Sequence, residues 1–375
     1  MSNNETQLDR VAERTPSGSN GQDRDSELLL DIRDLKVEFH SREGHVQVLR
    51  GVDLEVYPGE TLAIVGESGC GKSMTARSVL GIIPNPGRVV NGSITYYPTG
   101  SENPIELTTL PVDGKEIRRV RGGEIAMIFQ EPMTSLSPVH TIGNQIMEAI
   151  RLHVTEDPEE QKRRAIEALG LVGIPNPSSR INDYPFQLSG GMRQRVMLAM
   201  AISSEPKILL ADEPTTALDV TIQAQMLGLL RRLQRELGLS VVLITHNLGV
   251  VAATADRVAV MYMGRVVEEA SVNEIFANPK HPYTRGLMES IPKVGEAERR
   301  KLVSIPGNVP DMRADIPGCP FHPRCSEAIA GVCDVIEPGY HEVATGHTAR
   351  CVLYGDESER RPPESGPVEV NEEQE

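Results

Sequence analysis

A glycine-rich stretch near residue 70, AIVGESGCGKS, holds the residue types that bind phosphate. It fits the pattern G-x-x-x-x-G-K-[ST] through Gly66, Gly71, Lys72 and Ser73. Glycines let the backbone wrap closely around phosphate oxygens, so that successive N–H groups point inward. In this pattern the lysine reaches the β- and γ-phosphates, and the serine hydroxyl binds Mg²⁺. The stretch therefore predicts a nucleoside triphosphate site lined by Gly66, Glu67, Ser68, Gly69, Cys70, Gly71, Lys72, Ser73 and Met74.

Two acidic residues, Asp212 and Glu213, follow the apolar run KILLA. At the end of a strand, Asp212 is placed to hold Mg²⁺ through water, together with Ser73. Glu213 would then polarise the attacking water as the general base. An Asp–Glu pair also occurs as a solvated strand end, but an intact phosphate loop in the same chain favours the catalytic interpretation.

Four of the five cysteines lie near the end of the chain with the spacing C-x5-C-x7-C-x17-C: Cys319, Cys325, Cys333 and Cys351. Four thiolates suit a [4Fe–4S] cluster or Zn²⁺, and His322 leaves a mixed Cys/His zinc site open. The x2 spacing of most zinc ribbons is missing, which favours iron–sulfur over zinc. Free thiols are a third interpretation, and disulfides are rare in the cytoplasm. The fifth cysteine, Cys70, is interpreted as a small filler of the phosphate loop rather than a nucleophile.

Four short apolar runs must position these residues: TLAIVG, EIAMIF, KILLADE and VVLITH. Near-continuous apolar runs of strand length indicate a parallel sheet buried on both faces. Helical patterns separate them, as in TIQAQMLGLLRRLQRELG, which ends in a glycine as helices often do. The earlier segments LLLDIRDLKVEFH and VQVLRGVDLEVYPGE alternate more, which is typical of antiparallel strands. The sequence therefore predicts an α/β fold.

Length and charge limit the class of protein further. A chain of 375 residues can form one large domain and a smaller one. The formal net charge of −15 argues against nucleic-acid binding through bulk charge. The polar N-terminal stretch lacks the apolar core of a signal peptide, and no run approaches the roughly 18 apolar residues of a spanning helix. We therefore expect a cytoplasmic protein.

Six motifs follow one another in the order GESGCGKS, IFQEP, LSGGMRQR, ILLADEP, ALD and ITH. In this order, over about residues 32–270, they resemble the nucleotide-binding subunit of an ABC transporter. The resemblance implies a P-loop ABC-type domain with a RecA-like core, an antiparallel β subdomain and a helical subdomain. It also implies ATP hydrolysis with Mg²⁺, in a dimer that holds two ATP molecules between its subunits.

The same resemblance implies roles for particular residues. Gln130 resembles the Q-loop glutamine, which senses Mg²⁺ and the γ-phosphate, and the following EPMTSLSP would face a membrane subunit. Asp219 resembles the residue that communicates across the dimer. His246 resembles the switch histidine that contacts the γ-phosphate and, with Glu213 and Gln130, completes the catalytic set. The turn that would grip the γ-phosphate of the opposite subunit's ATP consists of Ser189, Gly190 and Gly191.

The adenine ring in this family usually stacks on an aromatic side chain upstream of the phosphate loop. Phe39 in LKVEFH is the best-matched position. The strand could equally bury Phe39, and Val46 and Tyr57 are rival positions.

After about residue 278 the sequence becomes Pro-rich and irregular. The segments NPKHPYTRGLMESIP, IPGNVPD and GCPFHPRC resemble the C-terminal extension of ATPase subunits from the oligopeptide/dipeptide importer group, some of which carry an iron–sulfur cluster there. The resemblance implies uptake of short peptides, with nickel or another small solute as the alternative. It implies as partners two integral membrane permease subunits, a second, different ABC ATPase and an extracytoplasmic solute-binding protein, with no nucleic acid. The chain would then lie peripherally at the cytoplasmic face of the cell membrane.

These patterns divide the chain into four predicted segments. They are a disordered tail (1–26), the ABC ATPase domain (27–277), the cysteine-bearing extension (278–355) and an acidic disordered tail (356–375). A DNA-repair or chromosomal ABC ATPase is disfavoured because no coiled coil separates the phosphate loop from LSGGMRQR. A translation-associated ABC protein would carry two nucleotide domains, and exporters often fuse membrane spans. The transported substrate, the pairing of the ATPase and the metal of the cysteines are open at this level.

Overall fold

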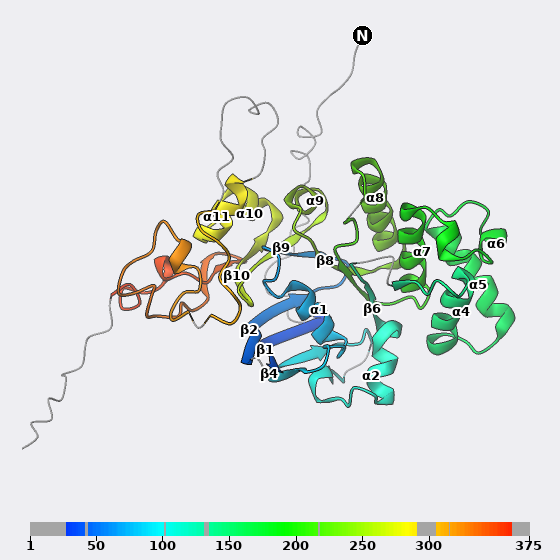
Figure 1. Cartoon of the computed structure of the whole chain (residues 1–375), viewed down its shortest axis with the longest axis horizontal. Helices are drawn as coiled ribbons and strands as arrows, with labels where there is room; N and C mark the ends of the chain where they lie inside the picture. The colour runs from blue at the N-terminus through cyan, green and yellow to red at the C-terminus, as the bar shows by residue number, and fades with distance from the viewer. Residues whose placement is uncertain are drawn as a thin grey trace, which may run out of the picture.

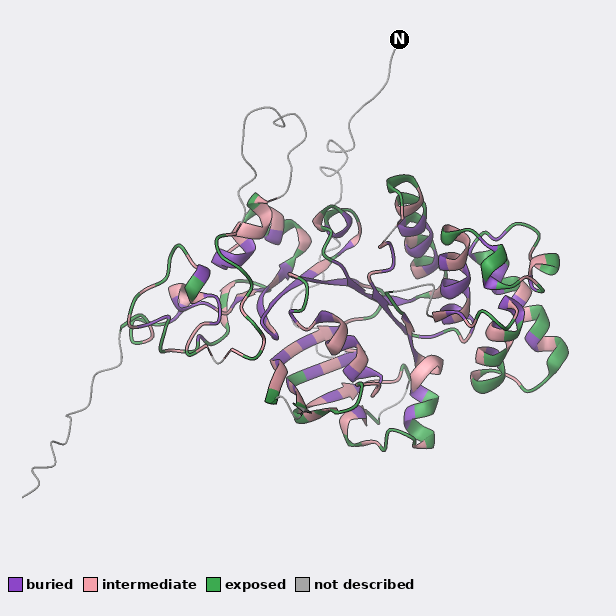
Figure 2. Cartoon of the chain, viewed as in Figure 1, coloured by how far each residue is buried: buried purple, intermediate pink, exposed green. Residues whose placement is uncertain are grey.

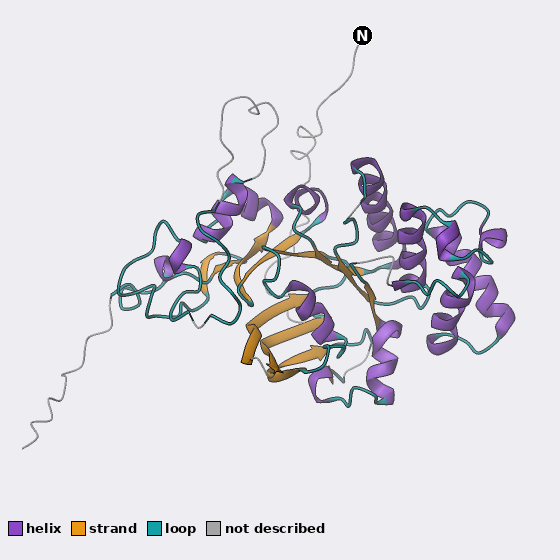
Figure 3. Cartoon of the chain, viewed as in Figure 1, coloured by secondary structure: helices purple, strands orange, loops and turns teal. Residues whose placement is uncertain are grey.

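An eight-stranded sheet runs through the centre of the computed structural model (Figure 1). The structure describes residues 28–41, 44–100, 103–130, 135–216, 218–290, 305–314 and 316–361. Within them the strand order of this sheet is β11-β12-β10-β9-β3-β8-β7-β6. A four-stranded sheet of order β2-β1-β4-β5 packs against it. Helices cover the remaining faces (Figure 3).

The parallel half of the large sheet consists of the four predicted runs. They form β3 (Thr61–Val65), β6 (Ile125–Ile128), β7 (Ile208–Asp212) and β8 (Ser240–Ile244). Every residue of β3, β7 and β8 is buried, which explains why these runs lack polar alternation (Figure 2). The prediction of a parallel, doubly covered core is confirmed.

The other half of the sheet was not anticipated from the sequence. Strand β9 (Arg257–Tyr262) is parallel to β3, but β10 (Arg265–Ser271) runs antiparallel to β9. The C-terminal strands β12 (His347–Ala349) and β11 (His341–Ala344) continue this antiparallel edge. The cysteine-bearing segment is therefore joined to the main sheet through backbone hydrogen bonds.

The four-stranded sheet is antiparallel, as the alternating early segments predict. It comprises β1 (Leu30–Ser41), β2 (Gly44–Val56), β4 (Gly87–Tyr96) and the short β5 (Ile105–Glu106). One hydrophobic cluster joins it to α1 (Lys72–Val79) and to the large sheet. Helix α1 therefore lies between the two sheets, directly after the phosphate loop.

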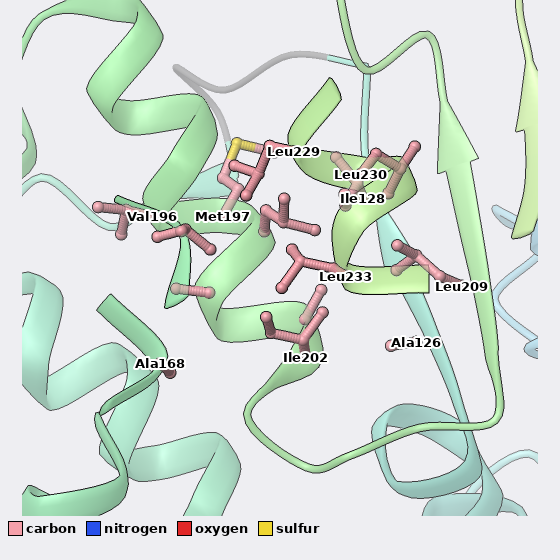
Figure 4. Close-up of a cluster of buried hydrophobic side chains, with 14 of the residues drawn as sticks. Ala126, Ile128, Ala168, Val196, Met197, Ile202, Leu209, Leu229, Leu230 and Leu233 are labelled. Atoms are coloured by element: carbon pink, nitrogen blue, oxygen red, sulfur yellow. The ribbon is translucent and has the colours of Figure 1, made fainter. Parts of the chain in front are cut away.

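Most of the remaining helices gather on the β6 side of the large sheet. They are α2 (Lys115–Arg119), α4 (Ile142–His153), α5 (Pro158–Leu171), α6 (Pro177–Arg180), α7 (Gly190–Ile202) and α8 (Val220–Leu237). Figure 4 shows part of the core that α4, α5, α7 and α8 share with β6 and β7, in which Met197 of α7 lies beside Leu229 of α8. Helix α8 ends at Gly238, whose positive φ of 65° suits a glycine C-cap, as predicted.

The opposite end of the molecule carries α9 (Leu248–Thr254), α10 (Val272–Ala277) and α11 (Pro282–Glu289). Beyond them the chain is irregular, with the short 3-10 turns η6 (His322–Arg324) and η7 (Val352–Tyr354). The buried members of its own small cluster are Val332, Cys333 and Val352.

No helix in the described part of the chain is long and apolar enough to cross a membrane. The predicted tail 1–26 and most of the predicted tail 356–375 lie outside the described residues, as do residues 131–134 of EPMTSLSP.

Candidate active site

The phosphate loop joins β3 to α1, and two of its glycines are required by their surroundings. Gly66 has a φ of 152°, and a Cβ there would lie 2.2 Å from the carbonyl oxygen of Met261. Gly71 has a φ of 107°, and a Cβ there would lie 2.7 Å from Leu49. Larger residues would push the loop out of the shape that turns its N–H groups inward.

Lys72 and Ser73 begin α1 and point in different directions. The Lys72 ammonium is almost fully buried and donates to the carbonyl oxygens of Gly66 (2.8 Å) and Glu67 (3.0 Å). The Ser73 hydroxyl donates to Asp212 Oδ1 at 2.9 Å. The structure thus brings together the two oxygen groups that were predicted to hold Mg²⁺, an ion that prefers oxygen ligands.

Asp212 is 1% exposed, and burial raises the pKa of its carboxyl group, while the Ser73 hydrogen bond opposes that shift. The next residue, Glu213, has a φ of 47°, which is unusual for a residue with a side chain. Its N–H donates to the carbonyl oxygen of Ile244 at 2.9 Å, which fixes the turn. The turn aims the side chains of Asp212 and Glu213 at different partners, and backbone strain of this kind is often found at functional sites.

The Glu213 carboxylate contacts three side chains, which come from the loops after three different strands. Gln130 Nε2 donates to Oε2 at 3.0 Å, and the Thr216 hydroxyl donates to the same oxygen at 2.8 Å. His246 Nδ1 lies 3.1 Å from Oε1. Burial raises the pKa of Glu213, but the Thr216 and His246 contacts outweigh it and leave the pKa below its ordinary value. Glu213 is therefore held as a carboxylate, the form that a general base requires.

The members of this group lie at the carboxyl ends of parallel strands. Gln130 follows β6, Asp212 ends β7, and His246 follows β8. Parallel strands bring their carboxyl ends to one edge of the sheet, where open α/β folds bind ligands. His246 has a side chain 63% exposed, so it is free to reach a ligand beside Glu213.

The turn Ser189–Gly191 is well formed and exposed. Ser189 is the N-cap of α7, and its hydroxyl accepts from the N–H of Met192 at 3.3 Å. Asp219 caps α8 in the same way, accepting from Ile222 N–H at 2.9 Å. No hydrogen bond among the described residues connects either cap to residues 66–74. Neither cap is therefore part of the hydrogen-bond network of this chain's own phosphate loop.

Phe39 is partly buried against the hydrophobic cluster of the four-stranded sheet. Its ring occupies the space that a side chain at position 87 would need, at 2.5 Å from an ideal Cβ of Gly87. Of the two rival positions, Tyr57 has its ring under the guanidinium of Arg257 at 5.0 Å. The adenine-stacking role of Phe39 stays a prediction.

The four C-terminal cysteines line one small enclosed space, together with His281, Phe321 and His322. All five cysteines of the chain are described, and none of them forms a disulfide. Burial raises the pKa of Cys319 to about 12 and that of Cys351 to about 11. His322 Nδ1 lies 2.9 Å from the carbonyl oxygen of Cys319, so this ring nitrogen is hydrogen-bonded to the backbone.

The spacing of these sulfur atoms bears on the metal that they would hold. Among the described residues, the group Glu38, His40 and His45 alone places three potential ligand atoms within 4.8 Å of one another, so no three of the cysteine sulfurs do so. One tetrahedral Zn²⁺ with bonds of about 2.3 Å would bring its sulfurs to about 3.8 Å from one another. Which metal the four cysteines hold stays a prediction.

Several residues of the site were missed by the sequence analysis. Thr216 and Gln194 contact the loop after β7, Gln194 through the carbonyl oxygen of Pro214. Arg324 and Tyr283, from the C-terminal segment, contact Glu67 of the phosphate loop. For Gln194, its place in LSGGMRQR was an available signal; for Arg324 and Tyr283 no local pattern predicts a partner so far away in sequence.

Comparison with known families gives two matches. The family model described as "ABC transporter" matches residues 49–216. The model described as "Oligopeptide/dipeptide transporter, C-terminal region" matches residues 267–333.

Curated relatives match along most of the chain. The "Probable peptide ABC transporter ATP-binding protein y4tR" of Sinorhizobium fredii is 50% identical and covers 87% of this chain and 95% of its own length. The "Dipeptide transport ATP-binding protein DppD" of Bacillus subtilis is 46% identical, over 89% of this chain and 97% of its own. The "Oligopeptide transport ATP-binding protein OppD" of the same organism is also 46% identical, over 90% and 92%.

Among solved structures, the dimeric post-hydrolysis state of the ATP-binding cassette MJ0796 bound to ADP and Pi has a TM-score of 0.56. It is 28% identical and covers 65% of this chain and 99% of its own. The cbiO1 structure from Clostridium perfringens has a TM-score of 0.55 at 28% identity, covering 67% of this chain and 92% of its own.

Proposed function

Because the chain belongs to the ABC transporter ATP-binding proteins of the peptide transport group, we propose that it hydrolyses ATP to energise the import of short peptides. The observation that carries the catalytic part is the carboxylate of Glu213, held between Gln130, Thr216 and His246 beside the Ser73–Asp212 pair. The relatives named for peptide, dipeptide and oligopeptide transport support the substrate class.

In the proposed reaction, the phosphate loop binds the triphosphate through its backbone N–H groups and the Lys72 ammonium. Ser73, Asp212 and Gln130 would hold Mg²⁺, which supplies neutralisation of phosphate charge. Glu213 accepts a proton from the attacking water as that water bonds to the γ-phosphorus and ADP leaves. His246 donates a hydrogen bond to the γ-phosphate, where negative charge is concentrated.

A second ATPase subunit is part of the proposal. Ser189, Gly190 and Gly191 lie at the exposed start of α7, and no hydrogen bond among the described residues joins them to this chain's own phosphate loop. A helix start with free N–H groups binds anions. These three residues would therefore grip the γ-phosphate of ATP held by the partner ATPase, which we propose to be a different chain, and Asp219 would communicate across the dimer. Two membrane permease subunits would receive the closing motion at the cytoplasmic face of the membrane, and an extracytoplasmic binding protein would deliver the peptide.

We also propose that the chain is organised as an ATPase unit over 27–277 and an extension over 278–355 that carries the metal centre. The four cysteines around one space support a [4Fe–4S] cluster, with Zn²⁺ as the alternative. Anaerobically purified protein should then show broad absorbance near roughly 400 nm from thiolate-bound iron. Protein that lacks iron and contains one zinc per chain would contradict the cluster.

Reconstitution tests the transport function. The chain is co-expressed with two candidate permease subunits and a second ATPase, the complex is placed in liposomes, and uptake of a radiolabelled dipeptide is measured with external binding protein. We expect ATP-dependent uptake that disappears when Glu213→Gln replaces the wild-type chain. Uptake of ⁶³Ni²⁺ with no uptake of dipeptides or longer peptides would overturn the peptide assignment and leave the ATPase assignment intact.

A further inference from the structure

Arg324 of the cysteine-bearing segment contacts the phosphate loop. Its guanidinium donates to both carboxylate oxygens of Glu67, from Nη1 to Oε2 at 2.8 Å and from Nη2 to Oε1 at 3.1 Å. Glu67 is the second residue of GESGCGKS, and Arg324 directly precedes Cys325. A guanidinium that meets a carboxylate in this two-point manner fixes both position and orientation.

Arg324 is itself held rigidly. Its side chain is 5% exposed, and Nε donates to the carbonyl oxygen of Pro306 at 2.9 Å. Its guanidinium carbon lies 5.9 Å from the ring centre of Tyr262 and 6.0 Å from that of Phe321. The Glu67 contact raises the pKa of Arg324, so the guanidinium stays charged. A buried charge of this kind is costly unless it is paired, and Glu67 is its partner.

A second contact reaches the same residue of the loop from α11. The Tyr283 hydroxyl accepts the backbone N–H of Glu67 at 2.9 Å. The Tyr283 ring lies against Tyr262 of β9 and Phe321, with centres 4.7 and 5.4 Å apart. Phe321 and Arg324 both lie between Cys319 and Cys325. The stretch between Cys319 and Cys325 therefore packs against the side of the phosphate loop that Glu67 occupies.

We propose that Arg324 and Tyr283 are positioning residues of the ATP site, and that the cysteine-bearing segment thereby sets how tightly ATP binds. Glu67 is fixed at its side chain by Arg324, at its N–H by Tyr283 and at its carbonyl by Lys72. Arg324 also neutralises a carboxylate that would otherwise repel the triphosphate next to it. The inference rests on the proposed function because it assigns Arg324 and Tyr283 a role at the ATP site.

The main test measures the dissociation constant of ATP with the purified full-length chain by fluorescence of a labelled nucleotide and competition with ATP. Arg324→Ala should raise the dissociation constant about tenfold, since a charge-assisted pair is lost and Glu67 is left uncompensated. Tyr283→Phe keeps the ring and removes the acceptor, so a rise of about two- to fivefold is expected. Arg324→Lys keeps the charge but not the two-point contact, and should lie between wild type and Arg324→Ala.

Two further variants separate positioning from general loss of structure. Arg285→Ala breaks the ion pair of Arg285 with Glu327 (2.8 Å). This pair joins α11 to the stretch that follows Cys325, and neither of its residues contacts the phosphate loop. Arg285→Ala should leave the dissociation constant of ATP unchanged. Glu67→Gln combined with Arg324→Ala should bind ATP more tightly than Arg324→Ala alone, because the uncompensated charge is gone.

Steady-state kinetics supply the second readout. Arg324→Ala should raise KM while kcat at saturating ATP stays near wild type, because the partners of Glu213 are untouched. A wild-type dissociation constant for both Arg324→Ala and Tyr283→Phe would overturn the inference and leave the ATPase assignment standing. A wild-type chain that neither binds nor hydrolyses ATP would instead overturn the proposed function.

Discussion

The two ends of the large sheet position functional residues in opposite ways. At the ATP site, buried parallel strands carry the reactive side chains on their ends, and three strands share one large hydrophobic cluster. In the cysteine-bearing segment the strands are short, and the buried part of its own cluster consists of Val332, Cys333 and Val352. A core that small stabilises little by itself. The ends of the buried parallel strands therefore fix the ATP site, whereas the segment is held to the sheet by one shared apolar cluster and by buried polar contacts.

One buried carboxylate, that of Glu268, shows how polar contacts hold the cysteine-bearing segment to the large sheet. Glu268 of β10 is fully buried and accepts from the N–H groups of Lys280 (2.6 Å) and His281 (2.8 Å) and from His347 Nε2 (2.7 Å). It thus ties the start of α11 and strand β12 to the main sheet. Polar contacts of this kind add to the apolar cluster in which Tyr283 and Phe321 pack against β9 and β10.

The largest expected effect concerns the sheet-borne site. Glu213→Gln keeps the shape of the side chain but removes the base, so kcat for ATP hydrolysis should fall roughly 10²- to 10⁴-fold while ATP affinity is kept. The measurement is phosphate release together with nucleotide binding. Glu167→Gln, on the exposed face of α5, is the matched control and should keep full activity. Normal turnover by Glu213→Gln would mean that another group is the base.

Lys72→Ala should act on binding instead of turnover. The variant loses the charged donor to the phosphates, at a cost of about 2–3 kcal/mol, or roughly 30- to 150-fold in the dissociation constant of ATP. Titration with labelled nucleotide checks this. The absorbance and metal content of the cysteine-bearing segment should stay unchanged, because Lys72 contacts Gly66, Glu67 and Cys70 of the phosphate loop and none of the four C-terminal cysteines. A loss of metal in this variant would show that Lys72 also supports the C-terminal segment.

Glu268→Gln should loosen the tie between the segment and the sheet. The amide has the shape of the carboxylate but leaves at least one of three donors facing an NH₂ group, at a cost of about 1–3 kcal/mol. Hydrogen exchange should quicken in β12 and at the start of α11, with little change in β3, β7 and β8. Glu342→Gln on the exposed part of β11 is the control. Equal loss of protection throughout the large sheet would mean that both regions unfold as one unit.

The smallest effect is expected from the segment's own core. Val332 is fully buried, but Val332→Ala should cost only about 1 kcal/mol of local stability, because the proposed metal centre at the cysteines would carry most of the stabilisation there. Local hydrogen exchange and metal content are the measurements. Complete loss of metal from this variant would show that the apolar core, rather than the cysteines, holds the segment.

The sequence alone predicted the parallel core because its strands are buried on both faces and read as unbroken apolar runs. It also predicted where the phosphate loop lies and that α8 ends at a glycine, since glycine patterns and helix ends are local signals. The antiparallel edge from β9 to β11 was missed. Strands β11 and β12 have only four and three residues, and β12 pairs with β10 through partners about 80 residues apart, such as Glu268 and Ala349.

At the candidate site, too, the sequence predicted some features and the tertiary structure alone decided others. Which residues could bind phosphate, hold Mg²⁺ or act as a base was determined by residue types and spacing, because these chemistries need particular groups in a fixed local order. That Glu213 meets Gln130 and His246, and that Arg324 reaches Glu67 across 257 positions, was decided only by the tertiary structure. Contacts between distant segments follow from how sheets and loops pack in space, and a local pattern carries no record of that packing.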